Sequence, residues 1–154
     1  MAEIRGYIHI IGLTYTTENR PTLMISRFAP GDTKLYRTTI SSADSAGFHG
    51  KQVHPVCATF ALARDIEWSS RLFVLEMTEE DEEGIGTFLS IEHKSPALVG
   101  EMLEIEATVK SWEGNELICT IDVRVGDRQV ATGETGQKIL KKEKLNLLFE
   151  RLKQ

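Results

Sequence analysis

The chain has 154 residues, of which 41% are hydrophobic and 27% are charged. These are ordinary values for a soluble globular protein, and the length predicts a single domain, 1–154, that buries its own core. Lys and Arg number 18 against 23 Asp and Glu, and this net charge of −5 argues against a nucleic-acid-binding protein. No apolar run approaches the roughly 18 residues of a membrane span. We therefore expect neither a nucleic-acid nor a membrane partner.

The start of the chain and its two cysteines bear on where the protein works. The first residues lack the charged and apolar regions of a secretory signal peptide. Cys57 and Cys119 are too few and too far apart for a disulfide framework or a metal site. We expect a cytoplasmic protein with reduced thiols, no metal and no cofactor.

The N-terminal third, 1–50, is expected to hold short strands followed by a loop. Apolar runs at 8–13, 23–28 and 35–40 favour strands. The stretch 41–52 is polar and contains glycine, which is typical of a loop or a short helix.

Residues 54–77 are predicted to form one long central helix. Pro55 suits a first helical turn, where its missing N–H costs nothing, and no glycine follows it within the segment. Apolar residues such as Phe60, Ile66 and Phe73 are spread over much of the helix circumference. This distribution predicts a helix buried in the core.

Residues 85–140 carry the clearest pattern, that of antiparallel strands. Apolar and polar residues alternate over 103–110 and again over 117–125, with Glu113-Gly114-Asn115 as the turn between them. A further turn at Gly126-Asp127 leads into the last strand, and another strand near residue 86 precedes all of these.

The last segment, 141–153, places leucines and Phe149 at helical spacing and is expected to be an amphipathic end helix. The order of elements predicts an α+β fold in which an antiparallel sheet wraps around one long helix. Such a sheet has an open flank, so we expect a homodimer, or a dimer of dimers, built by side-by-side pairing.

Glu67 is the unusual residue of the predicted helix, because it lies among apolar side chains. Burial would raise its pKa and suit it to general acid or base catalysis near neutral pH. The alternative is a solvated Glu on the wetter face that begins with Trp68. Periodicity leaves both open.

His93 ends a predicted strand on the same face as Leu89 and Ile91, which should meet the helix. Histidine titrates near neutral pH, although a lone histidine at the end of an apolar face is more often part of the core. Thr59, at the helix start, would by itself be a spacer or a local cap.

Two other groups are weaker candidates. Asp44 and His49 lie five residues apart in a polar stretch, where they would form a dyad or simply be solvated. Lys138, Lys141 and Lys142 would contact phosphates or form a solvated face. The sequence has no phosphate-binding loop, dinucleotide fingerprint, zinc spacing or serine nucleophile elbow.

From residue 56 to 140 the chain resembles hotdog-fold thioesterases of the fluoroacetyl-CoA thioesterase-like family. The resemblance is carried by Ala58-Thr59, Glu67-Trp68, Gly86-Thr87 and His93, followed by Pro96, Gly100 and Trp112-Glu113-Gly114. The separations of 8 residues from Thr59 to Glu67, 19 from Glu67 to Gly86 and 26 from Glu67 to His93 fit the family without gaps.

The resemblance implies an acyl-CoA thioesterase for a small or medium acyl group, with coenzyme A as part of the substrate. It makes Thr59, Glu67 and His93 the catalytic group and the backbone N–H of Gly86 the oxyanion donor. Glu67 would attack the thioester or act as base, Thr59 would position or relay, and His93 would deliver the proton. Thr87 is expected to contact the substrate, and the three lysines its nucleotide part.

One geometric conflict follows. Eight residues of straight helix span about 12 Å, so Thr59 and Glu67 of one chain cannot touch the same atom. Either Thr59 precedes the regular helix, or the site combines residues from two subunits. We favour a site at a dimer interface, as hotdog enzymes generally have.

The chain also departs from the family. It reads Glu134-Thr135-Gly136-Gln137 where the family has a His and an Arg, and its first 50 residues match poorly, so fluoroacetyl-CoA itself is not the expected substrate. Two alternatives remain: a hotdog enoyl-CoA hydratase or dehydratase that uses Asp44 and His49, and a non-catalytic hotdog protein that binds an acyl thioester. The side chains that line the site should distinguish them.

Overall fold

The structure is a computed structural model that describes residues 27–153. The strands expected at 8–13 and over most of 23–28 lie outside the described residues. The third expected strand is present as β1 (Thr33–Thr39).

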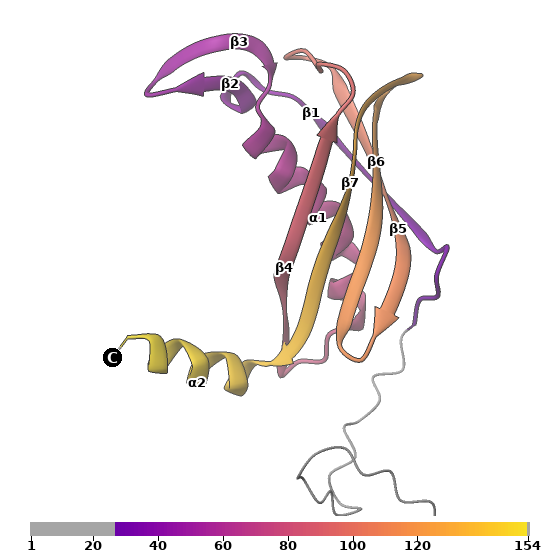
Figure 1. Cartoon of the computed structure of the whole chain (residues 1–154), viewed down its shortest axis with the longest axis vertical. Helices are drawn as coiled ribbons and strands as arrows, with labels where there is room; N and C mark the ends of the chain where they lie inside the picture. Colours follow the sequence, from indigo (N-terminus) through magenta and orange to yellow (C-terminus); the bar gives the residue numbers. More distant parts are fainter. Residues whose placement is uncertain (1–26, 154) are drawn as a thin grey trace, which may run out of the picture.

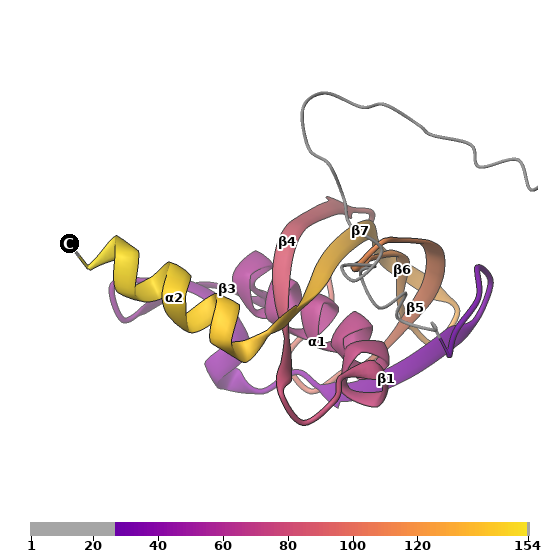
Figure 2. The same cartoon turned by 90° about the horizontal axis from the view of Figure 1, so that it is seen from below.

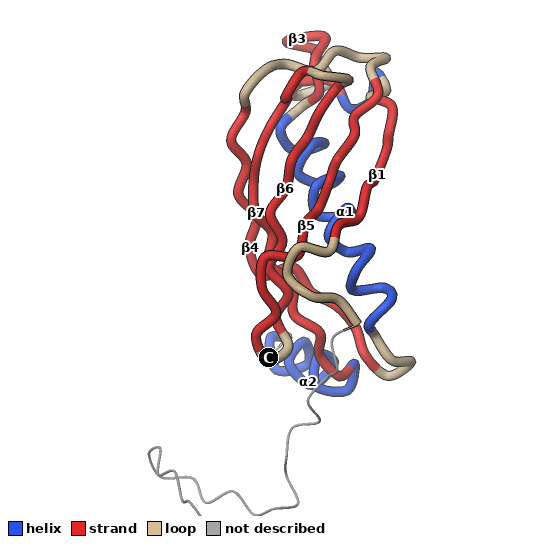
Figure 3. The backbone as a smooth tube through the Cα atoms, turned by 90° about the vertical axis from the view of Figure 1, so that its right-hand side faces the viewer, coloured by secondary structure: helices blue, strands red, loops and turns tan. Residues whose placement is uncertain are grey.

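One antiparallel sheet of five strands, in the order β1-β5-β6-β7-β4, curves around a single long helix, α1 (Figures 1 and 2). The remaining strands of this sheet are β4 (Glu82–His93), β5 (Met102–Glu113), β6 (Glu116–Val125) and β7 (Arg128–Lys141). Figure 3 shows α1 lying along one face of this sheet. The expected architecture, an antiparallel sheet around a central helix, is confirmed.

The C-terminal hairpins follow the predicted pattern. Gly114 and Gly126 adopt φ values of +63° and +55° in the two tight turns, a backbone conformation that favours glycine. Residue Ala107 pairs with Ile121 and Ile121 pairs with Gly133, so the inward residues of three strands form one row. Period-two alternation specified this register because a slip of one residue would expose the whole apolar set.

Helix α1 (Thr59–Met77) begins five residues later than the predicted 54. The residues before it form β3 (Lys51–Cys57), and Ala58 caps the helix in an extended conformation, with φ −68° and ψ 146°. Pro55, which suggested a helical first turn, lies within β3. Its fixed φ is equally compatible with an edge strand, so the residue alone did not decide between them.

The helix is also buried on one face only, in contrast to the all-round burial that its apolar composition predicted. Ile66, Phe73 and Val74 are at most 1% exposed against the sheet. Phe60 and Trp68 on the other face are 60% and 42% exposed. The second apolar face is therefore uncovered in a single chain.

The polar stretch expected as a loop or a short helix begins with a short helical turn, η1 (Ser42–Asp44), but continues as a hairpin of β2 (Ser45–Phe48) and β3, which was not expected. The end helix α2 (Lys142–Leu152) is present, with Leu145 as its buried residue. Figure 1 shows the β2–β3 hairpin and α2 extending from opposite ends of the molecule, both beyond edge strand β4. No helix within residues 27–153 is long and apolar enough to cross a membrane.

Candidate active site

The structure brings Thr59 and His93 together, although 34 residues separate them. Thr59 is the first residue of α1 and His93 the last of β4, and Thr59 Oγ1 lies 3.1 Å from His93 Nε2. At this distance an imidazole can exchange a proton with a hydroxyl group. The pair is therefore competent to relay a proton at the N-terminal end of the helix.

The pair lines a cavity of about 480 Å³ beneath the β2–β3 hairpin. Its walls also include apolar residues of α1, of β7 and of the segment after β4, among them Leu62, Ala97 and Val130. His54 of β3 lines the same cavity. Sequence reasoning missed His54 because the segment that carries it was predicted as helix rather than strand.

Glu67 and Gly86 form a second pair, two helical turns further along α1. A side-chain carbon built at residue 86 would lie 2.5 Å from Glu67 Oε1, so the carboxylate occupies the space that glycine leaves free. Glu67 also lines an open groove of about 560 Å³ with Trp68, Arg64 and Arg71. Glu67 and Gly86 are both exposed, and the groove gives a ligand access to the carboxylate.

The helix buries Asp65 rather than Glu67. Asp65 is 6% exposed and forms an ion pair with Arg64, whose Nε lies 2.9 Å from Asp65 Oδ1. Glu67 is exposed in the single chain. Within one chain, the structure therefore agrees with the solvated alternative for Glu67 and not with the buried one.

The two pairs lie apart within one chain. Thr59 to Glu67 spans about 12 Å of helix, at roughly 1.5 Å a residue. Gly86 to His93 spans about 23 Å of strand, at about 3.3 Å a residue. Because Thr59 belongs to the regular helix, the explanation that it precedes the helix is wrong. One chain does not bring Glu67 to His93.

Asp44 and His49 are not brought together. Asp44 ends η1, where it accepts hydrogen bonds from the Ser41 hydroxyl at 2.6 Å and from Arg64 at 3.0 Å. The Ser41 hydroxyl and the Arg64 guanidinium hold the pKa of Asp44 below its usual value. His49 lies at the hairpin tip with φ +50°. Neither residue lines the cavity that holds Thr59 and His93, so the arrangement required for the hydratase alternative is not formed.

Thr87 lies at a bulge, where the pairing of β4 with β7 skips one residue after Gly86. Its hydroxyl donates to Glu116 Oε1 at 2.8 Å. Lys138 Nζ lies 3.4 Å from Glu116 Oε2, so both residues share one carboxylate partner.

The other two lysines are also engaged. Lys141 Nζ lies 2.8 Å from Asp81 Oδ1 and 3.2 Å from Glu82 Oε1, and Lys142 Nζ donates to the Glu80 carbonyl at 2.8 Å. These contacts to the acidic turn before β4 give each ammonium group an internal partner. The hypothesis that the lysines bind the nucleotide part of a substrate gains no support from this placement.

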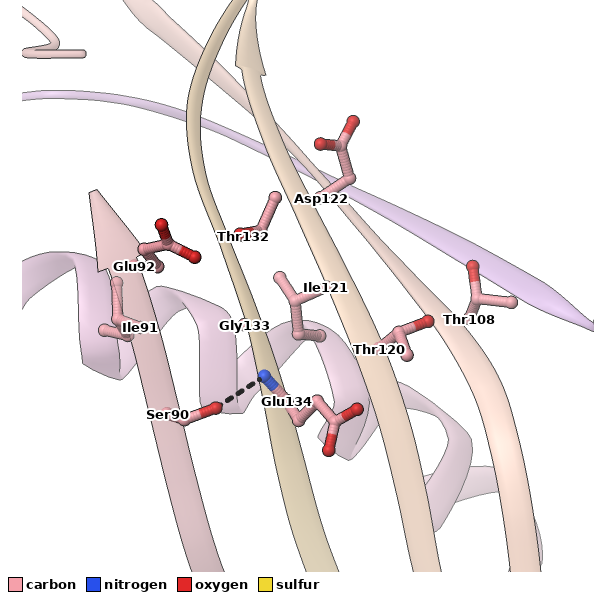
Figure 4. A pocket seen from close by; sticks show the side chains of 10 residues that line it. All are labelled: Ser90, Ile91, Glu92, Thr108, Thr120, Ile121, Asp122, Thr132, Gly133 and Glu134. Carbon is pink, nitrogen blue, oxygen red and sulfur yellow. Dashed lines mark hydrogen bonds between the residues drawn. The ribbon is translucent and has the colours of Figure 1, made fainter. Parts of the chain in front are cut away.

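A larger groove of about 630 Å³ lies on the opposite face of the sheet (Figure 4). Threonines and carboxylates line it, and the backbone N–H of Glu134 donates to Ser90 Oγ across it at 3.1 Å. It contains none of the candidate catalytic residues. The smaller cavity is the candidate site, because the hydrogen-bonded Thr59–His93 pair opens into it.

The cysteines are free, and both are shielded from solvent to some degree. Burial raises the pKa of Cys57 to about 11 and that of Cys119 to about 12. Cys57 lines the candidate cavity but is protonated at neutral pH. Within residues 27–153, no three His, Cys, Asp or Glu side chains are grouped as they would be around a metal ion.

An antiparallel sheet wrapped around one long helix is the hotdog fold, which several families of thioesterases share. A family model for the fluoroacetyl-CoA-specific thioesterase FlK matches residues 40–143. The chain belongs to this family of thioester hydrolases, which confirms the expected family and enzyme class.

Solved structures agree with this assignment. A hypothetical protein from Thermus thermophilus, described as a thioesterase superfamily member, is 31% identical, with a TM-score of 0.77 over 81% of this chain and 93% of that one. FlK itself is 17% identical, with a TM-score of 0.74 over 80% of this chain and 96% of that one. A hot-dog-like protein from Thermanaerovibrio acidaminovorans is 19% identical, with a TM-score of 0.74 over 80% and 93%. No curated protein matches the sequence.

Proposed function

We propose that the protein hydrolyses acyl-CoA thioesters with a small or medium acyl group, in a site shared by two copies of the chain. The observation that carries the proposal is the hydrogen-bonded Thr59–His93 pair, which opens into a largely apolar cavity of about 480 Å³. Apolar walls suit an acyl chain, and the pair suits proton transfer. A solved FlK structure is a complex with fluoroacetate and CoA, and we extend the acyl-CoA substrate class, but not the fluoroacetyl group, to this protein.

The proposed reaction assigns one task to each group. The Glu67 carboxylate either attacks the thioester carbonyl or removes a proton from the attacking water. The backbone N–H of Gly86 stabilises the oxyanion of the tetrahedral intermediate. When the C–S bond breaks, His93, positioned by Thr59, protonates the departing thiolate of coenzyme A. If Glu67 attacks, breaking the C–S bond leaves a mixed anhydride on its carboxylate, which a water molecule then hydrolyses. By either route the products are a carboxylic acid and the free thiol.

A second copy of the chain would reconcile the separation of the two pairs. Within residues 27–153, β4 is an end strand of the sheet and offers an unpaired edge. If two β4 strands pair antiparallel about a two-fold axis between Leu89 and Ser90, residue 86 of one copy faces residue 93 of the other. Glu67 and Gly86 then lie beside Thr59 and His93 of the partner subunit.

The exposed surface supports this assembly. Phe60, Trp68 and Leu75 on α1 are 60%, 42% and 49% exposed, and Leu89 on β4 is 36% exposed. Such apolar surface is typical of an interface. The hairpin and α2 both extend past the β4 edge, where they would flank a partner (Figure 1). We include in the proposal a homodimer that works in the cytoplasm, which suits the two free thiols.

The test is a panel of acyl-CoA substrates of increasing chain length, with release of the free thiol as the signal. We expect hydrolysis of at least one short or medium substrate. Glu67→Gln keeps the shape of the side chain and removes its charge, so it should lower kcat by about 100-fold or more. Glu76→Gln, on an exposed turn of the same helix, is the matched control. Wild-type turnover by Glu67→Gln, or no hydrolysis of any substrate by the wild-type protein, would overturn the proposal.

A further inference from the structure

Gln137 is a buried polar residue directly behind the Glu67–Gly86 pair. It is 1% exposed and lies on β7, where the ladder pairs it with Gly86 of β4 on one side and Leu117 of β6 on the other. Burying a primary amide is unfavourable unless hydrogen bonds replace its water contacts. The contacts of this amide therefore indicate why the residue is there.

The amide nitrogen of Gln137 bonds to the helix turn that carries Glu67. Nε2 donates to the Glu67 carbonyl at 3.1 Å and to Ser70 Oγ at 2.8 Å. The Ser70 hydroxyl in turn donates to the Glu67 carbonyl at 3.0 Å. Two side-chain donors, one on the sheet and one on the helix, thus converge on the backbone oxygen of a single residue.

The oxygen at the other end of the amide, Oε1, is buried without a hydrogen-bond partner in the described chain. A buried acceptor without a partner costs stability, which an apolar side chain of similar size would avoid. The benefit of glutamine at this position is therefore the Nε2 contact with the Glu67 turn.

Apolar packing of α1 on the sheet is not directional, so by itself it sets the position of the helix along the strands only loosely. The Glu67 carboxylate has to occupy the space over Gly86, where a side-chain carbon would come within 2.5 Å of Oε1. Gln137 is the residue of β7 that pairs with Gly86, and it donates a hydrogen bond to the backbone carbonyl of Glu67. Because hydrogen bonds are directional, this bond fixes the position of Glu67 relative to Gly86.

We propose that Gln137, with Ser70, is a positioning residue that holds the Glu67 carboxylate against Gly86. It does not touch the substrate and acts through Glu67, so this inference rests on the role proposed for Glu67. A small displacement of a catalytic group is enough to slow catalysis greatly, so loss of the Nε2 contact should slow the chemical step.

The test is Gln137→Met, which keeps most of the volume and removes the amide. We expect kcat for an accepted acyl-CoA to fall about tenfold, KM to change less than about twofold, and the melting temperature to be equal or higher. Ser69→Ala is the matched control, because Ser69 is also buried on α1 but donates to the Ile66 carbonyl, at 2.7 Å, instead of that of Glu67. It should leave turnover per folded molecule unchanged. A lower melting temperature with unchanged kcat in Gln137→Met would make Gln137 purely structural and overturn the inference.

A double variant shows whether Gln137 acts through Glu67. Glu67→Gln combined with Gln137→Met should be no slower than Glu67→Gln alone, because the carboxylate that Gln137 positions is already lost. Losses that multiply would contradict the inference. If Glu67→Gln itself turns over at the wild-type rate, the proposed function fails. If it is slow while Gln137→Met is as fast as wild type, the positioning role alone fails.

If Gln137→Met does not fold, Ser70→Ala carries the test. It removes one of the two side-chain donors to the Glu67 carbonyl and should lower kcat by several-fold, in contrast to Ser69→Ala. Equal turnover in the two serine variants would overturn the inference.

Discussion

The two halves of the candidate site are built differently. Thr59 and His93 lie at the ends of their elements and are joined by a direct 3.1 Å hydrogen bond beside a cavity. Glu67 and Gly86 lie within their elements, and their contact requires that residue 86 has no side chain. Gln137 on β7 donates a hydrogen bond to the backbone carbonyl of Glu67. The first pair depends on the bond between its members, whereas the second depends on how accurately the helix is placed on the sheet.

The largest effects should come from the residues that move protons. His93→Ala should lower kcat by about 100-fold, because the leaving thiolate loses its acid, and Thr59→Ala should cost less if Thr59 only positions. Steady-state kinetics on an accepted acyl-CoA measure both. His49→Asn is the control, since asparagine tolerates the positive φ at the hairpin tip. Loss of activity in that control, with activity retained in His93→Ala, would place His49 rather than His93 in the catalytic group.

Mixing inactive variants tests whether the two pairs meet across subunits. Co-refolded Glu67→Gln and His93→Ala chains should regain about a quarter of wild-type activity, because half of the dimers are mixed and each mixed dimer has one intact site of two. Each variant refolded alone should stay inactive. Absence of recovery in a mixture shown to contain mixed dimers would place each site within one chain.

Two glycine substitutions sharpen the contrast between a site contact and a structural one. Gly86→Ala should push aside the flexible Glu67 carboxylate, lowering kcat by about tenfold with little change in melting temperature. Gly133→Ala would instead bring its new carbon against the backbone oxygen of Ser90, which cannot move freely, and should lower the melting temperature. Thermal unfolding and steady-state kinetics of both variants measure the two effects. The opposite pattern would mean that Glu67 is not held over Gly86 in solution.

Asp44 is expected to stabilise the protein rather than to catalyse. Its pKa is lowered in the folded chain by the Ser41 hydroxyl and Arg64, so its contribution is present above the unfolded pKa of about 4 and is lost as the pH falls through the lower folded value. Asp44→Asn should therefore lower stability by about 1 kcal/mol at pH 7 and make it less sensitive to acid below about pH 4. Urea unfolding between pH 3 and pH 7 measures the free energy of unfolding of both proteins. We expect the substitution to leave kcat unchanged. A large fall in kcat would return Asp44 to the candidate catalytic groups.

The smallest effect should come from Cys57, although it lines the cavity. With a pKa of about 11 the thiol is almost fully protonated at pH 8, so iodoacetamide should modify it slowly. Cys57→Ala should keep wild-type turnover. Rapid inactivation by the reagent that Cys57→Ala abolishes would show that the thiol is closer to the chemistry than its surroundings indicate.

The sequence by itself determined the sheet and its turns. Alternation over 103–110 and 117–125, with Gly114 and Gly126 at positive φ, leaves one register in which the apolar residues face inward. The separations of Thr59, Glu67, Gly86 and His93 identified the family. These features depend on neighbouring residues or on fixed separations along the chain, so the amino-acid sequence alone is enough to predict them.

The tertiary structure decided where the helix begins, which of its residues are buried and what supports Glu67. Pro55 is compatible with both a helical turn and a strand, and only pairing between β2 and β3 distinguishes them. The sequence pattern does not distinguish an apolar helical residue that the sheet covers, such as Ile66, from one that it leaves exposed, such as Phe60. Gln137 meets Glu67 across 70 residues. Periodicity describes which faces of a single element are apolar. A contact such as that between Gln137 and Glu67 depends instead on how two elements are placed against each other, so the pattern of neither element predicts it.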